Sequence, residues 1–366
     1  MTNRELEILN IIKENPLISQ DELAYILGIT RSGVAAHIHN LMKKGYIKGR
    51  GYVLSETNFV TVIGGLNIDI MGISTERLID NNSNPGKIYF TLGGAARNIS
   101  LSLKKLNIPN YLISVYGDDM NGEKFINDCN ENDLNIQYCE KITGQHTSSF
   151  LYIDDTDGTK VMGIDDMDIF KNMTPDFITK YVKLINHSEY CVVDTNLPSE
   201  SIEYIYKNVL VPIIIKTTSI NKNSRLISFY QRIHTLITTS SELKELLLSY
   251  GEEYVNLEQA VNFILSKNVS NVIVFSIKEG LYFKNKTEEI YLKKNPESIV
   301  NTSGASAVLI GAVIWGLHNN LEWEQLLRFS YSGAILSVRS REPVSPLLST
   351  SELMIEEKKI FKKEKH

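Results

Sequence analysis

The sequence predicts an α/β protein with a mainly parallel sheet, preceded by a small module rich in α-helix. Its 366 residues are about twice the usual length of a domain, so two domains, or one large domain with an accessory, are expected. Buried-strand runs alternate with amphipathic stretches over most of the chain, which is the pattern of a parallel sheet covered by helices. Residues 1–55 instead show helical periodicity followed by a short basic segment.

The composition excludes several classes of protein. Hydrophobic residues make up 43% and charged residues 22%, as in an ordinary globular protein. No apolar run approaches the roughly 18 residues that span a bilayer, and the polar start lacks a signal-peptide core, so we expect a cytoplasmic protein without membrane contact. The three cysteines (Cys129, Cys139 and Cys191) lack metal-ligand spacing, which indicates inert buried thiols rather than a zinc site or a disulfide scaffold.

The charge is distributed unevenly. The whole chain has a net charge of −5, but residues 1–55 hold seven Lys and Arg against five Asp and Glu. This asymmetry indicates an anion-seeking N-terminal module attached to an acidic body.

The N-terminal module contains three predicted helices. The first ends at Asn15-Pro16, the second begins with a capping box of Ser19 and Glu22, and the third begins after a Thr30 cap and runs to about Lys44. We expect the following side chains of the last two helices to face the interior of the module: Leu23, Ile26, Leu27, Val34, Ile38, Leu41 and Met42.

A short basic hairpin, Tyr46 to Leu54, follows the third helix, and with this wing residues 1–56 resemble a winged helix-turn-helix DNA-binding domain. The third helix would enter the major groove and the wing would reach phosphates. The alternative is a helical dimerisation or docking domain with a merely solvated basic face. One such module makes few phosphate contacts, so we expect a homodimer on a two-fold operator. The expected DNA-binding residues are Arg31, Ser32, His39, Lys43, Lys48 and Arg50.

The rest of the chain alternates strands and helices. A hairpin around Asp157-Gly158 differs from this pattern and could form, with residues 87–91, a small second sheet over the pocket. The predicted strands of the main sheet are 59–63, 111–115, 190–193, 211–215, 234–238 and 272–276, and the predicted helices are 95–106, 120–132, 199–208, 241–250 and 257–266.

Three motifs carry a family resemblance: Gly64-Gly65-x-Asn67-x-Asp69, Gly93 to Asn98, and Asn301 to Ala307. In this order and spacing they resemble the PfkB family of carbohydrate and nucleoside kinases, and the segments 164–169 and 344–349 are similar to its pseudouridine kinase branch. The resemblance implies that residues 57–366 form a ribokinase-like three-layer domain with a small β lid. The Walker A phosphate-binding motif is absent. The acids of segment 164–169 suit lid or substrate contacts as well as an ordinary surface.

The substrate half of the expected site is intact. The resemblance implies that Asp69 accepts hydrogen bonds from sugar hydroxyls, helped by Asn67 and Asn98. Gly93 and Gly94 would allow close approach of the backbone to the sugar. The alternatives are a turn-capping Asp69, a helix-buried Asn98 and simple turn glycines.

The catalytic half departs from the family pattern. Family members have a GAGD signature that holds phosphoryl oxygens at a helix N-terminus and supplies an aspartate as base. Here the anion hole reads Gly304, Ala305, Ser306, Ala307, so an alanine stands at the base position. Of a family motif that orders metal and phosphate, only Glu242 remains. Two further departures on the nucleotide side are Lys216, where an aspartate is frequent, and bulky Phe275 to Ile277.

Two hypotheses follow from this mixture. In the first, the chain is a ligand-sensing transcriptional regulator whose kinase-like body has lost phosphoryl transfer. In the second, it is an ATP- and Mg²⁺-dependent kinase of a sugar or nucleoside such as pseudouridine, with Glu242 or a water replacing the missing base. General-base assistance is worth roughly 10²–10⁴ in rate, so loss of the aspartate alone leaves a poor kinase rather than an inert one. The sequence alone therefore leaves open whether the protein is an enzyme.

Overall fold

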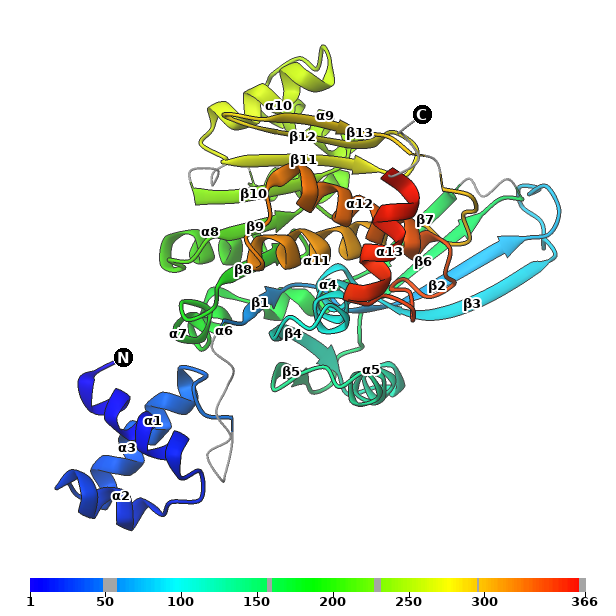
Figure 1. Cartoon of the computed structure of the whole chain (residues 1–366). Coiled ribbons are helices and arrows are strands. Elements are labelled where there is room, and N and C mark those ends of the chain that lie inside the picture. Colours follow the sequence, from blue (N-terminus) through cyan, green and yellow to red (C-terminus); the bar gives the residue numbers. More distant parts are fainter. Residues whose placement is uncertain (49–57, 157–159, 227–231, 295, 362–366) are drawn as a thin grey trace.

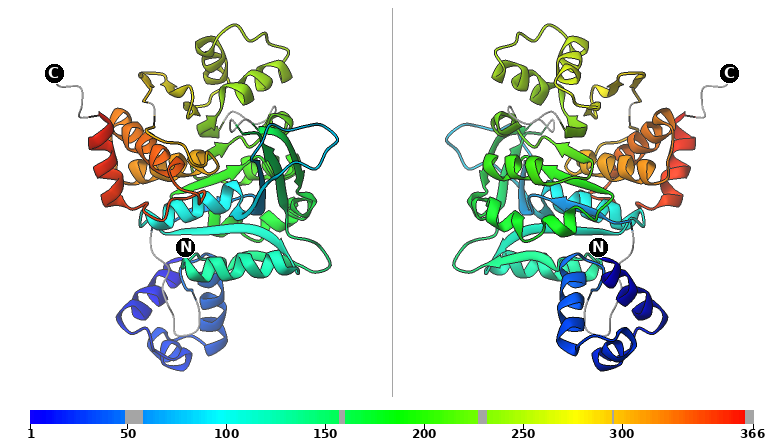
Figure 2. Two further views of the ribbon diagram at one scale, coloured as in Figure 1. Left: turned by 90° about the vertical axis from the view of Figure 1, so that its right-hand side faces the viewer. Right: turned by 90° about the vertical axis from the view of Figure 1, so that its left-hand side faces the viewer.

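The computed structural model describes residues 1–48, 58–156, 160–226, 232–294 and 296–361. It consists of a small helical module and a large α/β body, with the module beneath the body in both side views (Figures 1 and 2). The expected boundary at residues 56 and 57 lies outside the described residues. The helices of the module are α1 (Asn3–Glu14), α2 (Gln20–Leu27) and α3 (Arg31–Lys43).

The starts of α2 and α3 in the N-terminal module are those that the sequence predicts. Ser19 and Glu22 form a reciprocal capping box on α2, and the Thr30 hydroxyl accepts from the Gly33 N–H at 3.1 Å on α3. Two of the side chains expected to face the interior do not do so, because Ile26 is 56% exposed and Met42 is 37% exposed. Three short helices cover only a narrow stripe of one another, so side chains just beside that stripe remain in solvent. The buried core of the module consists of Ile8, Leu9, Ile12, Ile18, Leu23, Val34, Ile38, Leu41 and Ile47.

The described part of the body contains a nine-stranded main sheet in the order β13-β12-β11-β10-β9-β8-β1-β4-β5. The strands from β11 to β5 are parallel, and β12 and β13 add an antiparallel edge. Their bounds are β1 (Val60–Ile63), β4 (Asn110–Gly117), β5 (Tyr138–Ile142), β8 (Tyr190–Asp194), β9 (Ile213–Lys216), β10 (Ile233–Thr238), β11 (Asn271–Ser276), β12 (Gly280–Asn285) and β13 (Glu289–Leu292).

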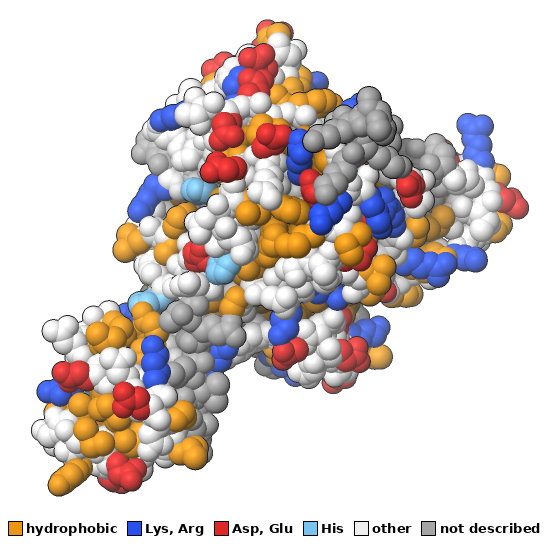
Figure 3. Space-filling model, in the orientation of Figure 1, with side chains coloured by type: hydrophobic (Ala, Val, Ile, Leu, Met, Phe, Trp, Pro, Cys, Tyr) orange, Lys and Arg blue, Asp and Glu red, His pale blue; other side chains and the backbone are white. Residues whose placement is uncertain are grey.

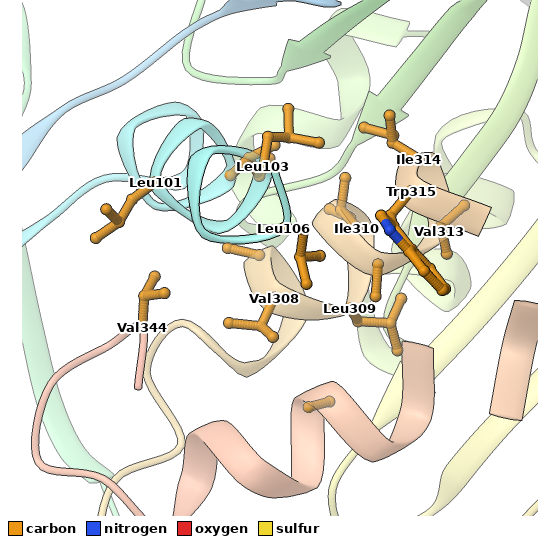
Figure 4. Close-up of a cluster of buried hydrophobic side chains, with 14 of the residues drawn as sticks. Leu101, Leu103, Leu106, Val308, Leu309, Ile310, Val313, Ile314, Trp315 and Val344 are labelled. Carbon is orange, nitrogen blue, oxygen red and sulfur yellow. The ribbon is translucent and has the colours of Figure 1, made fainter. Parts of the chain in front are cut away.

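Helices cover both faces of the main sheet, which confirms the three-layer α/β fold. One core lies between the sheet and α4 (Ala95–Lys105), α5 (Met120–Glu131), α11 (Ala305–His318), α12 (Trp323–Val338) and α13 (Thr350–Phe361). Figure 4 shows its centre, where leucines of α4 meet the mainly apolar helix α11. The second core lies under α6 (Pro175–Thr179), α7 (Val182–Ile185), α8 (Ser199–Asn208), α9 (Ser240–Ser249) and α10 (Leu257–Ser266), with the 3₁₀ turns η1 (Asp168–Asn172) and η2 (Ile220–Leu226) between the elements.

A separate four-stranded sheet, in the order β3-β2-β6-β7 among the described residues, forms the small second sheet that the sequence predicts. We call it the lid. It projects from the body on the right of Figure 1. The segment after β1 enters this sheet as a long strand, which the sequence analysis did not anticipate. The lid strands are β2 (Asn67–Ser74), β3 (Gly86–Gly93), β6 (Ser149–Asp154) and β7 (Lys160–Asp166).

The order of the parallel strands fixes where a ligand can bind. From β1 the chain first builds toward β4 and β5, and then returns to add β8, β9, β10 and β11 on the other side. In open α/β sheets a crevice forms beyond the carboxyl ends of the strands where the order reverses. The residues after β1 and β8 therefore mark the expected ligand site.

Two of the three cysteines are buried in the cores of the body. All three cysteines are free thiols, and burial raises the pKa of both Cys129 and Cys191 to about 12, so these two thiols are inert at neutral pH. Among the helices of the described ranges, none has both the length and the apolar character needed to cross a membrane.

A buried ion pair in the module gives a pH prediction. Burial opposes ionisation of Glu5, but hydrogen bonds from the Lys44 side chain (2.6 Å) and the Thr2 N–H (2.7 Å) outweigh it and lower its pKa. The folded state therefore gains stability above the unfolded pKa of about 4.3, and loses it as pH falls toward the lower folded pKa. Glu5→Gln should destabilise the module by about 1–3 kcal/mol at pH 7, measured by hydrogen exchange of α1 and α3 in the full chain.

The difference between wild type and Glu5→Gln should shrink as the pH is lowered below about 4. Glu7→Gln is the control, since Glu7 pairs with Arg4 on an exposed face of the same helix. A constant difference between Glu5→Gln and wild type from pH 7 to pH 3 would contradict the assignment.

Candidate functional site

One buried carboxylate holds together the loops that surround the site. Asp194, the last residue of β8, is 1% exposed. Its Oδ2 accepts from the Gly65 N–H at 2.8 Å and from the Ala96 N–H at 3.1 Å, and its Oδ1 accepts from the Asn196 N–H at 2.8 Å. Burial raises the pKa of Asp194, and these three N–H donors oppose that rise. The carboxylate thus joins the ends of β1 and β8 to the start of α4.

Two glycines are required by the close packing of these loops. Gly94 precedes α4 with a φ of +95°, and a Cβ there would lie 2.5 Å from the Gly65 carbonyl oxygen. Gly304 precedes α11 with a φ of +82°, and a Cβ there would lie 2.0 Å from the Pro343 carbonyl oxygen. At both positions the positive φ and the lack of space for a Cβ exclude residues other than glycine. Gly93 has a different reason, because it packs directly against the Asp69 carboxylate.

A cavity of about 270 Å³ lies between these loops and the lid. It includes most of the predicted substrate and anion-hole residues, which come from β2, α4 and the start of α11. Gly93 and Ala305 do not line it, because Gly93 lies behind Asp69 and Ala305 is buried in the core. The lining residues that the sequence singled out are Asn67, Asp69, Gly94, Asn98, Lys216, Gly304, Ser306 and Ala307.

Asp69 has the geometry of a hydrogen-bonding anchor in this cavity. The Asn67 Nδ2 donates to its Oδ1 at 2.5 Å, and the Ser303 hydroxyl lies 3.4 Å from its Oδ2. The side chain is 6% exposed, so a hydroxyl that reaches it leaves bulk water. A carboxylate oriented in this way can accept from vicinal sugar hydroxyls.

The N-terminal turn of α11 contributes a second wall of the cavity, which favours an anion, whereas Asp69 itself carries a negative charge. Gly304, Ser306 and Ala307 line this wall, and a helix N-terminus favours an anion. Ala307 brings only a methyl group, so it cannot take a proton from a substrate hydroxyl. Two of the remaining cavity-lining residues that the structure describes, Asp69 and Asp165, carry carboxylates.

Glu242 does not fit the role of a metal ligand. Its Oε2 accepts from the Thr217 hydroxyl at 2.6 Å and from the Thr239 N–H at 3.0 Å, which completes a capping box on α9. The Lys216 ammonium lies 3.7 Å from the same oxygen, where a second cation would be repelled. Within the described ranges no group of three or more metal-ligating side chains occurs. Glu242 is therefore committed to the α9 cap and to Lys216, and is not available to bind Mg²⁺.

A lysine connects the lid to the body at the edge of the cavity. Lys222 in η2 donates to Asp165 Oδ2 of β7 at 2.9 Å and to Asn196 Oδ1 at 2.9 Å. Asp165 is thus a lid contact, one of the two roles that the sequence left open. Asp168 instead pairs with Lys171 on the surface.

The sequence analysis missed Asp194, Asn196 and Lys222. Asp194 directly follows a buried β-run, and an acid at the carboxyl end of such a strand is a signal that could have been used. Lys222 lies in a short 3₁₀ segment without hydrophobic periodicity, so no sequence pattern marks it.

The surface of α3 carries most of the predicted DNA-binding residues. Arg31, Ser32, His39 and Lys43 are all exposed. Three of these residues and Ala35 lie four residues apart, which places them in one row along the helix. Lys48 differs, because its ammonium lies 5.9 Å from the ring centroid of Tyr111 in the body. Arg50 and most of the predicted wing lie outside the described residues.

The fold and the cavity at the switch point define the class of protein. A solved structure of Arabidopsis thaliana ribokinase, complexed with ribose and ATP, superposes with a TM-score of 0.70 at 20% identity. The match covers 83% of this chain and 99% of that chain, which shows a ribokinase-like fold.

The family assignment follows from the sequence. Residues 57–350 match the pfkB family of carbohydrate kinases, and residues 1–48 match a winged helix-turn-helix DNA-binding domain. The chain therefore belongs to the pfkB family of carbohydrate kinases and carries a winged helix-turn-helix domain at its N-terminal side.

Two curated relatives of Escherichia coli K12 cover most of the chain. The uncharacterised sugar kinase YeiI is 33% identical over 351 residues, which are 95% of this chain and 97% of YeiI. The pseudouridine kinase is 25% identical over 305 residues, which are 82% of this chain and 97% of that enzyme.

The role of Asp194 can be tested without altering any residue that lines the cavity. Asp194→Asn replaces one acceptor by an NH₂ group that faces backbone N–H donors. We expect the free energy of unfolding to fall by about 2–4 kcal/mol, measured by urea denaturation of the full chain. Asp168→Asn makes the same chemical change at a surface pair whose acid is 82% exposed, and should cost less than about 0.5 kcal/mol. Equal losses in the two variants would contradict the role of Asp194.

Proposed function

We propose that the protein is a ligand-sensing transcriptional regulator, in which a kinase-like body has kept its sugar pocket and lost efficient phosphoryl transfer. One observation carries the proposal: Ala307 lines the same cavity as Asp69, at the position where the family pattern has the base. The pocket thus retains groups for binding hydroxyls but lacks, at that position, a group to deprotonate one. The ligand would be a ribosyl or related sugar compound.

The alternative is an active kinase that uses ATP and Mg²⁺ on a sugar or on a nucleoside such as pseudouridine. It needs a substitute base. Glu242 is poorly suited, because it does not line the cavity and is held by the α9 cap and by Lys216. Asp165 is engaged by Lys222 at 2.9 Å. These contacts favour the regulator.

Contacts between module and body supply a route from ligand to DNA. Gly45, just after α3, packs so closely on α7 that a Cβ there would lie 2.3 Å from Leu184 Cδ1. The Tyr46 ring meets the His187 ring edge-on with centroids 4.7 Å apart. The chain leading to α7 begins as lid strand β7, in which Asp165 lines the cavity. A ligand that prefers one lid position can therefore bias the position of α7, on which the N-terminal module packs.

The DNA-binding half of the proposal relies on the row of exposed residues on α3. Figure 3 shows basic, acidic and hydrophobic side chains intermixed on the visible face of the module, so a single copy has no strong positive patch on that face. A dimer would double the number of phosphate contacts.

We propose that the dimer forms through the outer face of the lid. The ladder places Ile70 beside Phe90 and Leu151, and Leu151 beside Ile164, on the face opposite to Asp69. Phe90 is 64% exposed and Ile164 is 59% exposed. An exposed apolar patch of this kind marks an interaction site. All side chains of this patch are apolar, so two copies can meet across a two-fold axis, with the Lys124 ammonium 6.0 Å from the Phe90 ring centroid beside the contact. Its residues are Ile70, Ile88, Phe90, Leu151, Ile153, Met162 and Ile164.

The function is tested on DNA and on ATP with the same preparation. The wild type should shift a DNA fragment from its own genomic neighbourhood and respond to a sugar or nucleoside, with no substrate-dependent ATP turnover. Arg31→Ala with Lys43→Ala should weaken DNA binding at least about tenfold and reduce its salt dependence. Lys13→Ala on α1 is the control for loss of a positive charge elsewhere in the module, and should have little effect. Ala307→Asp with Ser306→Gly, assayed alongside, reports whether turnover can be restored. Clear turnover by the wild type, or no DNA binding at low salt, would overturn the proposal.

The dimer is tested by analytical ultracentrifugation of the full chain. Phe90→Glu with Ile164→Glu places charges in the centre of the lid face and should convert dimer to monomer, because burying unpaired carboxylates is costly. Leu210→Glu, at a site after α8 that is 71% exposed, should leave the mass unchanged. A monomeric wild type, or a dimer unaffected by the lid variant, would exclude this interface.

A further inference from the structure

The cavity carries a buried cation that a neutral sugar does not require. Lys216, the last residue of β9, lines the cavity and is only 7% exposed. Its ammonium donates to the Thr217 carbonyl oxygen, which is its one hydrogen bond in the described part of the chain. An ammonium group has three donors. Two donors of this buried cation therefore remain for a group inside the cavity.

The nearest carboxylate does not satisfy this lysine. Glu242 lies 3.7 Å away, beyond hydrogen-bond distance, and its Oε2 already accepts from the Thr217 hydroxyl and from the Thr239 N–H. The ion pair offsets part of the cost of burying Lys216 but leaves its donors unused. A buried charge with unused donors favours an anion close by.

The other groups at this wall also favour an anion. Ser306 contributes a hydroxyl and lies in the first turn of α11, whose positive end faces the cavity. Ala307 removes the negative charge that the family pattern would place there. Of the two cavity carboxylates named above, Asp165 is paired with Lys222. Asp69 is then the carboxylate whose negative charge offsets the positive charge of Lys216.

We infer that the ligand is a phosphate monoester of a ribosyl compound, with hydroxyls at Asp69 and the phosphate at Lys216, Ser306 and the start of α11. This inference rests on the proposed function and names the chemistry that the sensor detects. A cavity of about 270 Å³ is near the lower limit for small-molecule sites, and it suits one phosphorylated sugar better than a sugar together with a nucleotide. The sensor thus recognises what a sugar-phosphorylating reaction releases, and a separate enzyme must supply it.

The inference is tested by calorimetric titration of the full chain with ribose, ribose 5-phosphate, pseudouridine, pseudouridine 5′-phosphate and inorganic phosphate. The phosphorylated member of at least one pair should bind about tenfold or more tightly than its unphosphorylated form. Inorganic phosphate should bind more weakly than the ester, because it lacks the hydroxyls that reach Asp69. The two pairs distinguish a free pentose phosphate from a nucleotide as the source of the shared ribosyl phosphate.

Two kinds of variant identify the groups that hold the phosphate. Lys216→Met should reduce the preference for the phosphorylated form at least about tenfold, and Lys278→Met, at an exposed turn, should leave it unchanged. Ala307→Asp should reduce the preference by charge repulsion, while the similarly sized Ala307→Asn should reduce it much less. Because Asp and Asn are similar in size, both substitutions disturb the core around Ala307 alike, so their difference reports the charge even where loss of Lys216 disturbs folding.

The outcomes separate this inference from the proposed function. Binding of unphosphorylated ribosyl compounds with no preference for their esters would overturn the inference and leave the sensor intact. Equal affinity for inorganic phosphate and for the esters would also overturn it. Substrate-dependent ATP turnover by the wild type would overturn both.

Discussion

The geometry of the site depends on the buried carboxylate of Asp194. A parallel sheet brings the carboxyl ends of β1 and β8 to one edge, but adjacent loops at that edge have backbone N–H groups without ladder partners. Asp194 accepts from three of these N–H groups and so fixes the Gly64-Gly65 turn, the residues after β8 and the start of α4 in one arrangement. The Arg225 guanidinium reinforces it by donating to three successive carbonyl oxygens after β8. Asp69 and Asn98 face one cavity because these loops cannot shift independently.

Much of this architecture could be predicted because it is encoded locally. The helices of the N-terminal module begin at Ser19 and Thr30, whose side chains cap them whatever the rest of the chain does. The six predicted strands of the main sheet are mainly apolar runs, as expected for strands buried on both faces. The edge strands β5, β12 and β13 were not predicted, and β5 and β13 lack such runs. The lid hairpin was predicted from Asp157-Gly158 and from the runs on either side of it; these two residues themselves lie outside the described part of the chain.

The parts that could not be predicted depend on contacts between distant segments. β2 is amphipathic only because one of its faces borders the cavity and the other forms the exposed side of the lid. Lys222 is important because η2 brings it to Asp165, 57 residues earlier in the chain. Lys48 was assigned to DNA from its place in the module, and its contact with Tyr111 follows from how the module meets the body. Periodicity contains no information about such pairings.

The start of α11 shows how one element can separate the constraints on folding from those on catalysis. Gly304 is fixed by its positive φ and by the adjacent Pro343 carbonyl, so the backbone tolerates no replacement there. Ser306 and Ala307, two and three residues further on, have ordinary helical backbone; both line the cavity, and the Ala307 methyl also packs in the core beneath it. Small side chains at these two positions can therefore change what the cavity binds while the backbone of α11 stays the same. A lineage can abandon turnover in this way while its pocket, still maintained by selection on folding, remains available for a new role in recognition.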